Sequence, residues 1–255
     1  DILKDMNITD TVVTPATNAL FEENNDILLD NTAKDIFHST IAKIMYIARI
    51  IRVDVLTAAN YLSSRVDCPN IQDWKKLIRI CKYLNNNKDK CNIFKNNVQL
   101  LPVVYSDASF IIHADATSRT GIIACAAGGI LYATSKKQHE ISKSSAEAEL
   151  IAANQAVEIA IYIRNLLNEL INYNDKITIN IDNKSTIQMI NNNKPNHMRT
   201  KHIKMKYFWI KQYIDSQEIT INHVPTNFNY ADVLTKPLYG TRFKSLINSI
   251  LYQRK

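Results

Sequence analysis

The sequence lacks paired cysteines, long apolar runs and a signal peptide, and glycine is scarce, with four residues in all. No two cysteines have Cys-x-x-Cys spacing, so a structural zinc site is not expected. We interpret Cys68, Cys81, Cys91 and Cys125 as free thiols of a reducing compartment. No apolar run is long enough to cross a membrane. Because the first residue is not Met, the chain is expected to be a fragment or a processed product.

The composition is that of a folded globular protein. Hydrophobic residues make up 46% of the 255 residues and charged residues 22%, which excludes a disordered chain. This length suits one large domain or two ordinary ones. The net charge of +7 suggests a polyanionic partner, although a basic balance is also common in proteins that bind no nucleic acid.

The first third of the sequence predicts a small helical region after an irregular lead-in at 1–34. Apolar residues recur at helical spacing from Ile41 to Ile51 and form one stripe (Ile41, Ile44, Met45, Ala48 and Ile51). Asp54 is expected to cap a second helix, and Asp73 to begin a third. The helical region is expected to span 35–97, and its polar, lysine-rich last part, from Asn85 to Asn97, marks a domain boundary.

The third helix of this region is expected to have one basic face. The residues on that face are Lys75, Lys76, Arg79 and Lys82. Two interpretations remain open from the sequence: a solvated charged surface, or a contact with nucleic acid.

The region 98–255 has the pattern of an α/β domain with a mixed sheet. Strand-like segments with turn signals between them predict an antiparallel meander, followed by a long helix that serines and an early acid introduce. The expected strands are 100–107, 110–114, 120–126, 129–134, 177–181 and 219–224. The expected helices are a long one that follows the serines of 142–145 and runs to about Leu170, and shorter ones at 184–191, 200–215 and 241–252.

Four acidic residues stand where side chains of an α/β fold can converge. Asp107 and Asp182 end strands, whereas Glu149 and Asp232 lie near the starts of helices. Clustered carboxylates supply the hard oxygen ligands that Mg²⁺ prefers, and two such ions support phosphodiester cleavage. Taken singly, each acid is better interpreted as an ordinary surface residue or a helix cap, and Asp232 in particular could be an N-cap.

Glu149 is chosen over Glu147 because of the helix stripe that it shares. Its partners at helical spacing are all alanines (Ala152, Ala153, Ala156 and Ala160), which suits close packing of a helix on a sheet. Glu147 lies about 200° away around the helix and is interpreted as a first-turn acid that the helix dipole favours.

Seven sequence blocks in order resemble the ribonuclease H domain of copia-type retrotransposon Pol proteins. The blocks are Tyr105-Ser-Asp-Ala-Ser109, Ser135-Lys-Lys-Gln138, Lys143-Ser-Ser-Ala-Glu-Ala-Glu-Leu-Ile-Ala152, Ile181-Asp-Asn-Lys-Ser185, Arg199-Thr-Lys-His-Ile203, Val224-Pro-Thr226 and Ala231-Asp-Val-Leu-Thr-Lys-Pro-Leu238. Segments around Phe37–Tyr46, Arg52–Asp54 and Trp74–Leu84 resemble the thumb or connection of the same polyproteins.

The resemblance implies a ribonuclease H-like fold with a mixed five-stranded sheet, preceded by a helical thumb or connection region. It implies an endoribonuclease that hydrolyses the RNA strand of RNA–DNA hybrids by a two-metal mechanism. Asp107, Glu149, Asp182 and Asp232 would hold two Mg²⁺, with Mn²⁺ as a substitute. The expected partner is the polymerase part of the polyprotein, with no membrane. The expected location is intracellular: the cytoplasm, within a virus-like particle if the element is active, or the nucleus.

Two departures from the family pattern limit this inference. Cellular ribonucleases H carry a histidine in the loop before the last aspartate, but the loop 225–230 has none. His223 precedes that loop within a strand, where packing and product release are both open roles. No Asp-Asp pair occurs, so the fragment lacks the polymerase palm motif.

The span from Asn183 to Ile214 contains no acid and many basic residues, which favours phosphate contact. The aromatics Tyr207, Phe208 and Trp209 are interpreted as core residues. The candidate nucleic-acid contacts are Ser109, Ser145, Asn183, Lys184, Arg199, Lys201, His202 and Lys204, with weaker candidates His223, Lys136 and Lys137.

Two other functions fit parts of the pattern. A non-catalytic or domesticated module could bind nucleic acid or support the polymerase subunit, although the four intact acids argue against loss of catalysis. An integrase-type transferase would need three acids with a different spacing and would lack the block that contains Glu147 and Glu149.

Overall fold

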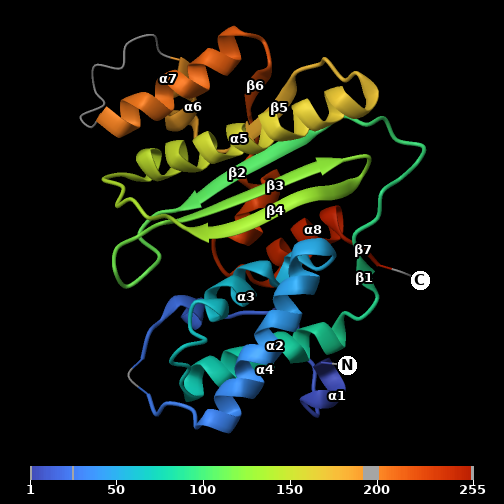
Figure 1. Cartoon of the computed structure of the whole chain (residues 1–255), viewed down its shortest axis with the longest axis vertical. Coiled ribbons are helices and arrows are strands. Elements are labelled where there is room, and N and C mark those ends of the chain that lie inside the picture. The colour runs from blue at the N-terminus through green and yellow to red at the C-terminus, as the bar shows by residue number, and fades with distance from the viewer. Residues whose placement is uncertain (1, 25, 192–200, 254–255) are drawn as a thin grey trace. The chain divides into compact units, whose positions relative to one another are not determined.

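The computed structural model describes residues 2–24, 26–191 and 201–253, and the chain divides into two compact units (Figure 1). One unit comprises residues 1–92 with 236–255, and the other comprises residues 93–235. By its contacts, the closing segment from Lys236 therefore belongs with the helical unit, whereas the sequence assigned it to 98–255. The expected domain boundaries at 34 and 97 remain predictions.

The helical unit contains the elements at both ends of the chain. Strands β1 and β7 pair antiparallel, through Lys90 with Gln253 and Cys91 with Tyr252. The elements are α1 (Ile2–Asp5), η1 (Asn18–Phe21), α2 (Asn31–Ile50), η2 (Val53–Val55), α3 (Leu56–Ser63), α4 (Ile71–Asn86), β1 (Lys90–Cys91), α8 (Gly240–Ile250) and β7 (Tyr252–Gln253).

Most of the apolar stripe on α2 is confirmed. Ile41, Ile44 and Ala48 are buried, and Met45 is half-buried. Ile51 lies just beyond the end of α2 and is 41% exposed, so including it in the stripe was wrong.

Asp54 does not cap the second helix, because its carboxylate is engaged inside the unit. Arg52 donates Nε to Oδ1 at 3.0 Å and Nη2 to Oδ2 at 2.8 Å. The Tyr83 hydroxyl donates to Oδ2 at 2.7 Å. The N-cap residue of α3 is Val55, whose apolar side chain makes no capping hydrogen bond. At α4 the N-cap is Asn70, and Asp73 completes a capping box as the third helical residue.

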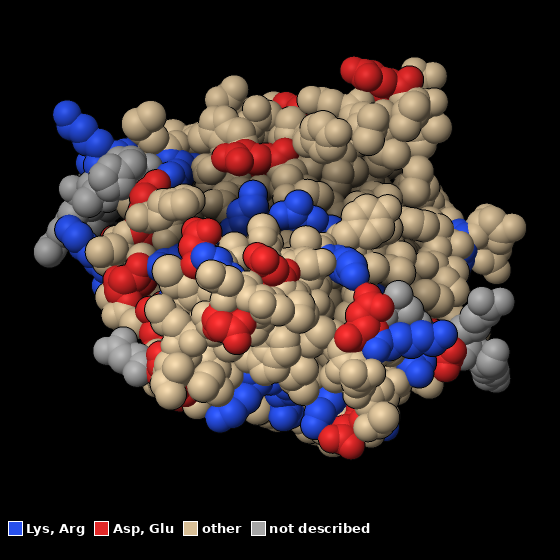
Figure 2. Space-filling model, turned by 60° about the horizontal axis from the view of Figure 1, so that its bottom comes forward, with Lys and Arg blue, Asp and Glu red and all other residues tan. Residues whose placement is uncertain are grey.

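Three of the four residues on the basic face of α4 contact the lead-in segment, whereas Lys75 is exposed. Lys76 Nζ donates to the Glu22 carbonyl at 2.9 Å, and Arg79 Nη2 donates to Thr14 Oγ1 at 3.0 Å. Lys82 pairs with Asp10 at 2.7 Å. These contacts favour a structural role for the face over a phosphate contact. On the side of the molecule shown in Figure 2, Lys and Arg lie among Asp and Glu.

The second unit contains a five-stranded mixed sheet in the order β4-β3-β2-β5-β6, which confirms the expected fold class. β2, β3 and β4 pair antiparallel, whereas β5 and β6 run parallel to β2. The elements are β2 (Val103–Ser109), β3 (Arg119–Ala126), β4 (Gly129–Lys137), α5 (Ser145–Ile171), β5 (Ile177–Ile181), α6 (Lys184–Asn191), α7 (Lys201–Asp215), β6 (Ile219–His223), η4 (Thr226–Phe228) and η5 (Tyr230–Leu234).

The expected strand at 110–114 is wrong, because these residues belong to the loop that joins β2 to β3. Ile111 has a left-handed backbone with φ of 47°, which interrupts an extended chain. Its N–H binds Ser118 Oγ at 3.2 Å within the loop, so no strand partner is used.

Helix α5 lies across the sheet, as Figure 1 shows, and its alanine stripe forms the contact. Ala152, Ala153, Ala156 and Ala160 are all completely buried. Small side chains allow the close approach of helix to sheet that the sequence predicted. None of the helices in the described part of the chain is both long and apolar enough to cross a membrane.

Candidate metal centre

Asp107 lies inside β2, two residues before its end, and Asp182 directly follows β5. The two come together because β2 and β5 run side by side in parallel. Ser106 pairs with Ile181 in the register of these strands, so the residue after each is an aspartate at the same edge. Asp107 is 3% exposed, and Asp182 is half-buried. The parallel pairing thereby places two carboxylates together, as the sequence predicted.

Glu149 reaches this edge from the start of α5. The helix is capped by Ser144, whose hydroxyl accepts from the Glu147 N–H at 3.2 Å. The Glu147 carboxylate accepts from the Lys143 N–H at 2.8 Å, which confirms its role as a first-turn acid. Glu149 is 6% exposed on the alanine side of the helix.

The three carboxylates of Asp107, Glu149 and Asp182 form one cluster. Each offers an oxygen, and these oxygens lie within 4.8 Å of one another. The donors are all hard carboxylate oxygens, without histidine or cysteine, which fits Mg²⁺ or Mn²⁺ better than zinc or copper. The residues present therefore suit the divalent cation that the resemblance implies.

Asp232 is not among the acids of the described residues whose oxygens lie within 4.8 Å of one another, although the sequence placed it with the other three acids. It is fully buried within η5, a 3-10 helix that packs on β2 and β3. The N-cap of η5 is Asn229, so reading Asp232 as the cap was wrong. A role for Asp232 as a metal ligand remains a prediction.

Two polar residues that the sequence analysis missed attach η5 to the strand that carries Asp107. Asn229 Nδ2 donates to the Ser106 carbonyl at 2.9 Å, and its Oδ1 accepts from the Ala231 N–H at 3.2 Å. The Thr235 hydroxyl donates to Asp107 Oδ2. The N-cap preference of asparagine was a signal for Asn229. No local pattern pointed to Thr235.

Gly121 on β3 allows this close approach of η5. A Cβ at this position would lie 2.7 Å from the Ala231 carbonyl oxygen and 2.8 Å from Leu234 Cβ and Thr235 Cγ2. Gly121 pairs directly with Asp107 across the sheet. Position 121 must therefore be glycine for η5 to pack this closely beside the strand pair that carries Asp107.

The block Ser135-Lys-Lys-Gln138 supports the neighbourhood of the site by hydrogen bonds. Gln138 Nε2 lies 3.0 Å from both Thr120 Oγ1 and the Ala148 carbonyl, which ties the loop before α5 to β3. The hydroxyl of Ser135 accepts from Arg119 Nη1 at 2.9 Å. This part of the family motif therefore contributes positioning contacts.

Arg119 is buried beside a histidine. Its Nε donates to His113 Nε2 at 3.3 Å, which requires a neutral imidazole at that nitrogen. Burial lowers the pKa of His113 to about 4, and the neighbouring charges of Arg119 and Lys137 add to the effect.

The candidate nucleic-acid contacts are distributed over several elements of the second unit. Lys184 at the start of α6 and Lys201 and Lys204 on α7 are exposed. Ser145 is exposed at the start of α5, whereas Ser109 is 9% exposed at the end of β2. Arg199 and the side chain of His202 lie outside the described residues.

Other candidates have structural partners or different surroundings from those expected. Asn183 accepts the Thr186 N–H at 3.0 Å and so caps α6. Lys136 is exposed at the end of β4, whereas Lys137 pairs with Asp115. His223 ends β6 with an exposed side chain, which argues against the packing role; a role in product release stays a prediction.

The expectation for the aromatic residues of α7 is confirmed in part. Tyr207 is 2% exposed and belongs to the core cluster, and Trp209 packs partly buried against it. Phe208 is 56% exposed, so including it in the core was wrong.

The four cysteines are free thiols, as predicted.

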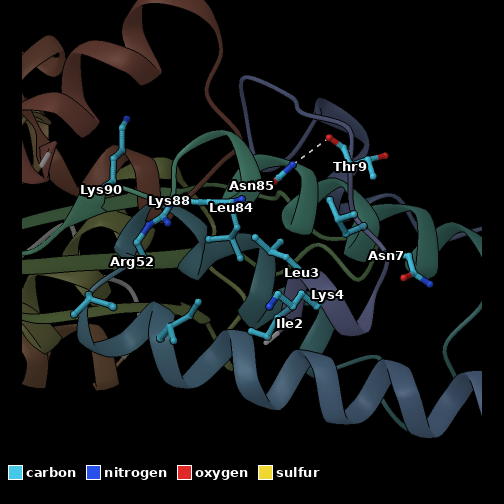
Figure 3. A pocket seen from close by; sticks show the side chains of 13 residues that line it. Ile2, Leu3, Lys4, Asn7, Thr9, Arg52, Leu84, Asn85, Lys88 and Lys90 are labelled. Atoms are coloured by element: carbon cyan, nitrogen blue, oxygen red, sulfur yellow. Dashed lines mark hydrogen bonds between the residues drawn. The ribbon is translucent and has the colours of Figure 1, made fainter. Parts of the chain in front are cut away.

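A cavity of about 670 Å³ lies in the helical unit and is distinct from the carboxylate cluster. Figure 3 shows its basic side chains, and the described residues that line it include no Asp or Glu. Its charged residues are Lys4, Arg52, Lys88 and Lys90. Asn85 Nδ2 donates to the Thr9 carbonyl at 3.2 Å at its edge. With basic groups only, this cavity is unsuited to a metal cation.

Comparison with known proteins finds retrotransposon Pol polyproteins similar to most of the chain. The chain is 30% identical over 215 residues to the Pol polyprotein of transposon TNT 1-94 from Nicotiana tabacum, covering 84% of this chain and 16% of that protein. The polyprotein of transposon RE2 from Arabidopsis thaliana is 31% identical over 217 residues, covering 84% and 15%.

The Ty1-ER2 Gag-Pol polyprotein of Saccharomyces cerevisiae is 26% identical over 211 residues, covering 81% of this chain and 12% of that protein. The chain thus spans about a sixth or less of the curated relatives that it matches. No family model matches the chain.

Solved structures with a similar fold include a foamy viral protease-reverse transcriptase in complex with double-stranded DNA. Its TM-score is 0.50 at 13% identity, covering 82% of this chain and 40% of that one. The N-terminal RNase H domain of a Mycobacterium tuberculosis protein has a TM-score of 0.41 at 13% identity, covering 54% and 91%.

Proposed function

We propose an endoribonuclease activity for this chain, because it has a ribonuclease H-like fold and is similar to a segment of copia-type retrotransposon Pol polyproteins. It would hydrolyse the RNA strand of RNA–DNA hybrids as part of a reverse transcriptase. The observation that carries the proposal is the cluster of Asp107, Glu149 and Asp182, whose oxygens lie within 4.8 Å of one another.

In this proposal the three clustered acids hold two Mg²⁺, with Mn²⁺ as a substitute, and Asp232 is the fourth ligand. When bound, such ions activate a water and stabilise the leaving oxygen of the cleaved strand. The protein contributes rigidity, since Asp107 and Glu149 are buried on a central strand and a packed helix. Buried ligands on regular elements are pre-organised, which lowers the cost of gathering like charges.

The hybrid is proposed to lie along the basic side chains of α6 and α7. Lys184, Lys201 and Lys204 are exposed there, and Lys136 adds a further exposed cation at the end of β4. Contacts with phosphates and 2′-hydroxyls suit an enzyme that recognises hybrid shape more than sequence. Arg199, His202, Ser145 and the exposed His223 remain candidates for the same surface.

The wider setting is also a proposal. The polymerase part of the same polyprotein is the expected partner, because the fragment lacks an Asp-Asp pair of its own. The expected location is the cytoplasm, within a virus-like particle for an active element, or the nucleus.

The test is a cleavage assay on an end-labelled RNA–DNA hybrid with Mg²⁺, using the chain together with its polymerase part. Asp107→Asn keeps the shape of the side chain and should reduce cleavage at least about 100-fold, since an amide is a poor ligand for a hard cation. The matched control is Asp175→Asn, which changes an exposed acid of the same unit and should leave the rate unchanged.

Each outcome separates the candidate functions. Metal-dependent cleavage that Asp107→Asn abolishes supports the endoribonuclease. Hybrid binding without cleavage by the parent supports a non-catalytic module. Cleavage that survives in Asp107→Asn would mean that the active site lies elsewhere.

A further inference from the structure

Thr235 joins the end of η5 to the acidic strand through its hydroxyl. Thr235 Oγ1 donates to Asp107 Oδ2, and both residues are buried, with exposed fractions of 0% and 3%. The two residues are 128 positions apart in the sequence, so only the fold brings them together. A hydroxyl that donates to an ionised carboxylate makes a charge-assisted bond, which is stronger than a neutral one.

The hydroxyl has one hydrogen and two acceptors within reach. The Asp232 carbonyl lies 3.2 Å from Thr235 Oγ1, and the same carbonyl already accepts from the Thr235 N–H at 3.3 Å. The charged acceptor is therefore favoured for the hydroxyl hydrogen. The bond holds the plane of the Asp107 carboxylate in one orientation.

The position of Thr235 is itself fixed by packing. Its Cγ2 would lie only 2.8 Å from a Cβ on residue 121, where the chain has glycine. Asn229, at the other end of η5, is bound to the Ser106 carbonyl next to Asp107. Both ends of the short helix are thereby attached to β2, so Thr235 cannot move away without breaking buried contacts.

We propose that Thr235 is a positioning residue for metal binding at Asp107. It acts through Asp107 by orienting the carboxylate whose oxygen lies within 4.8 Å of those of Glu149 and Asp182. It also couples this ligand to the segment that carries Asp232. The inference rests on the proposed metal site, and groups that orient metal ligands commonly affect affinity about 10–100-fold.

The test measures Mn²⁺ and Mg²⁺ binding to the 255-residue chain by isothermal titration calorimetry, independently of any cleavage. Thr235→Val removes the hydroxyl and keeps both branches of the side chain, whereas Thr235→Ser keeps the hydroxyl and removes the methyl group. Thr235→Val should weaken the affinity roughly 10-fold or more, and Thr235→Ser should remain within about 3-fold of the parent. Thermal unfolding in EDTA reports whether each metal-free variant is folded.

The pair of variants separates orientation from packing. Equal affinities of Thr235→Val and the parent, or a loss confined to Thr235→Ser, would overturn the positioning role. If Thr235→Val unfolds in EDTA, the affinity of folded Thr235→Ser decides: parent-like binding supports the hydroxyl, and a loss overturns it.

Asp107→Asn serves as the reference for the site itself. If Asp107→Asn binds Mn²⁺ as the parent does, the proposed metal site fails. If Asp107→Asn loses binding while Thr235→Val keeps it, only the role of Thr235 fails.

Discussion

Replacing Asn229 with alanine should destabilise the second unit by several kcal/mol. Asn229 is completely buried and makes two hydrogen bonds, one to the Ser106 carbonyl and one from the Ala231 N–H. Loss of an N-cap costs about 1 kcal/mol. A buried carbonyl that loses its side-chain donor costs a further ~1–3 kcal/mol. The free energy of unfolding should therefore fall by roughly 2–4 kcal/mol.

The assay is urea denaturation followed by tryptophan fluorescence. The sequence contains two tryptophans, Trp74 in the helical unit and Trp209 on α7 of the second unit. A Trp74→Phe background therefore leaves one probe in the unit that contains Asn229. The free energy of unfolding is obtained by linear extrapolation to zero urea.

Two further variants sharpen the result. Asn227→Ala changes an exposed asparagine of the same loop and should alter the stability by less than about 0.5 kcal/mol. Asn229→Asp keeps the acceptor for the Ala231 N–H but loses the donor to Ser106, so it should also destabilise the unit. Equal stabilities of Asn229→Ala and Asn227→Ala would refute the argument that Asn229 holds η5 on β2.

Three other perturbations test separate parts of the structure. Gly121→Ala should destabilise the second unit by about 1–3 kcal/mol in the same urea assay, because its methyl group would lie 2.7 Å from the Ala231 carbonyl oxygen; parent-like stability would contradict this contact. The pKa of His113 is lowered from 6.5 to about 4, so the unfolded chain binds the proton first as the pH falls. The free energy of unfolding should therefore fall as the pH is lowered from 6.5 to 4. This fall should be up to roughly 3 kcal/mol larger in the parent than in His113→Gln, and an equal pH dependence of the two proteins would exclude the effect. Asp54→Asn should destabilise the helical unit by about 3–5 kcal/mol, monitored through its tryptophan, because a buried guanidinium loses its charged partner. Asp35→Asn, which changes an exposed acid, is its control. Equal losses of stability in the two variants would contradict a stabilising role for the pair of Arg52 and Asp54.

The sequence by itself determined the order of the main elements and which three acids form the cluster. Strands with alternating apolar residues and a helix with an alanine stripe have local periodicities that do not depend on distant contacts. Asp107 lies near the end of such a strand and Asp182 directly follows one, and the stripe distinguished Glu149 from Glu147. The fold class followed from the same periodicities together with the family blocks.

Only the tertiary structure decided how the site is supported. The bond from Thr235 to Asp107 and the bond from Asn229 to Ser106 join residues 128 and 123 positions apart, and no local pattern specifies such pairs. The same reason explains the errors at Asp54 and Ile111, where a buried ion pair and a left-handed residue overrode local preferences. Long-range packing also placed Asp232 in a buried 3-10 helix that contacts β2 and β3, which its sequence setting alone did not specify.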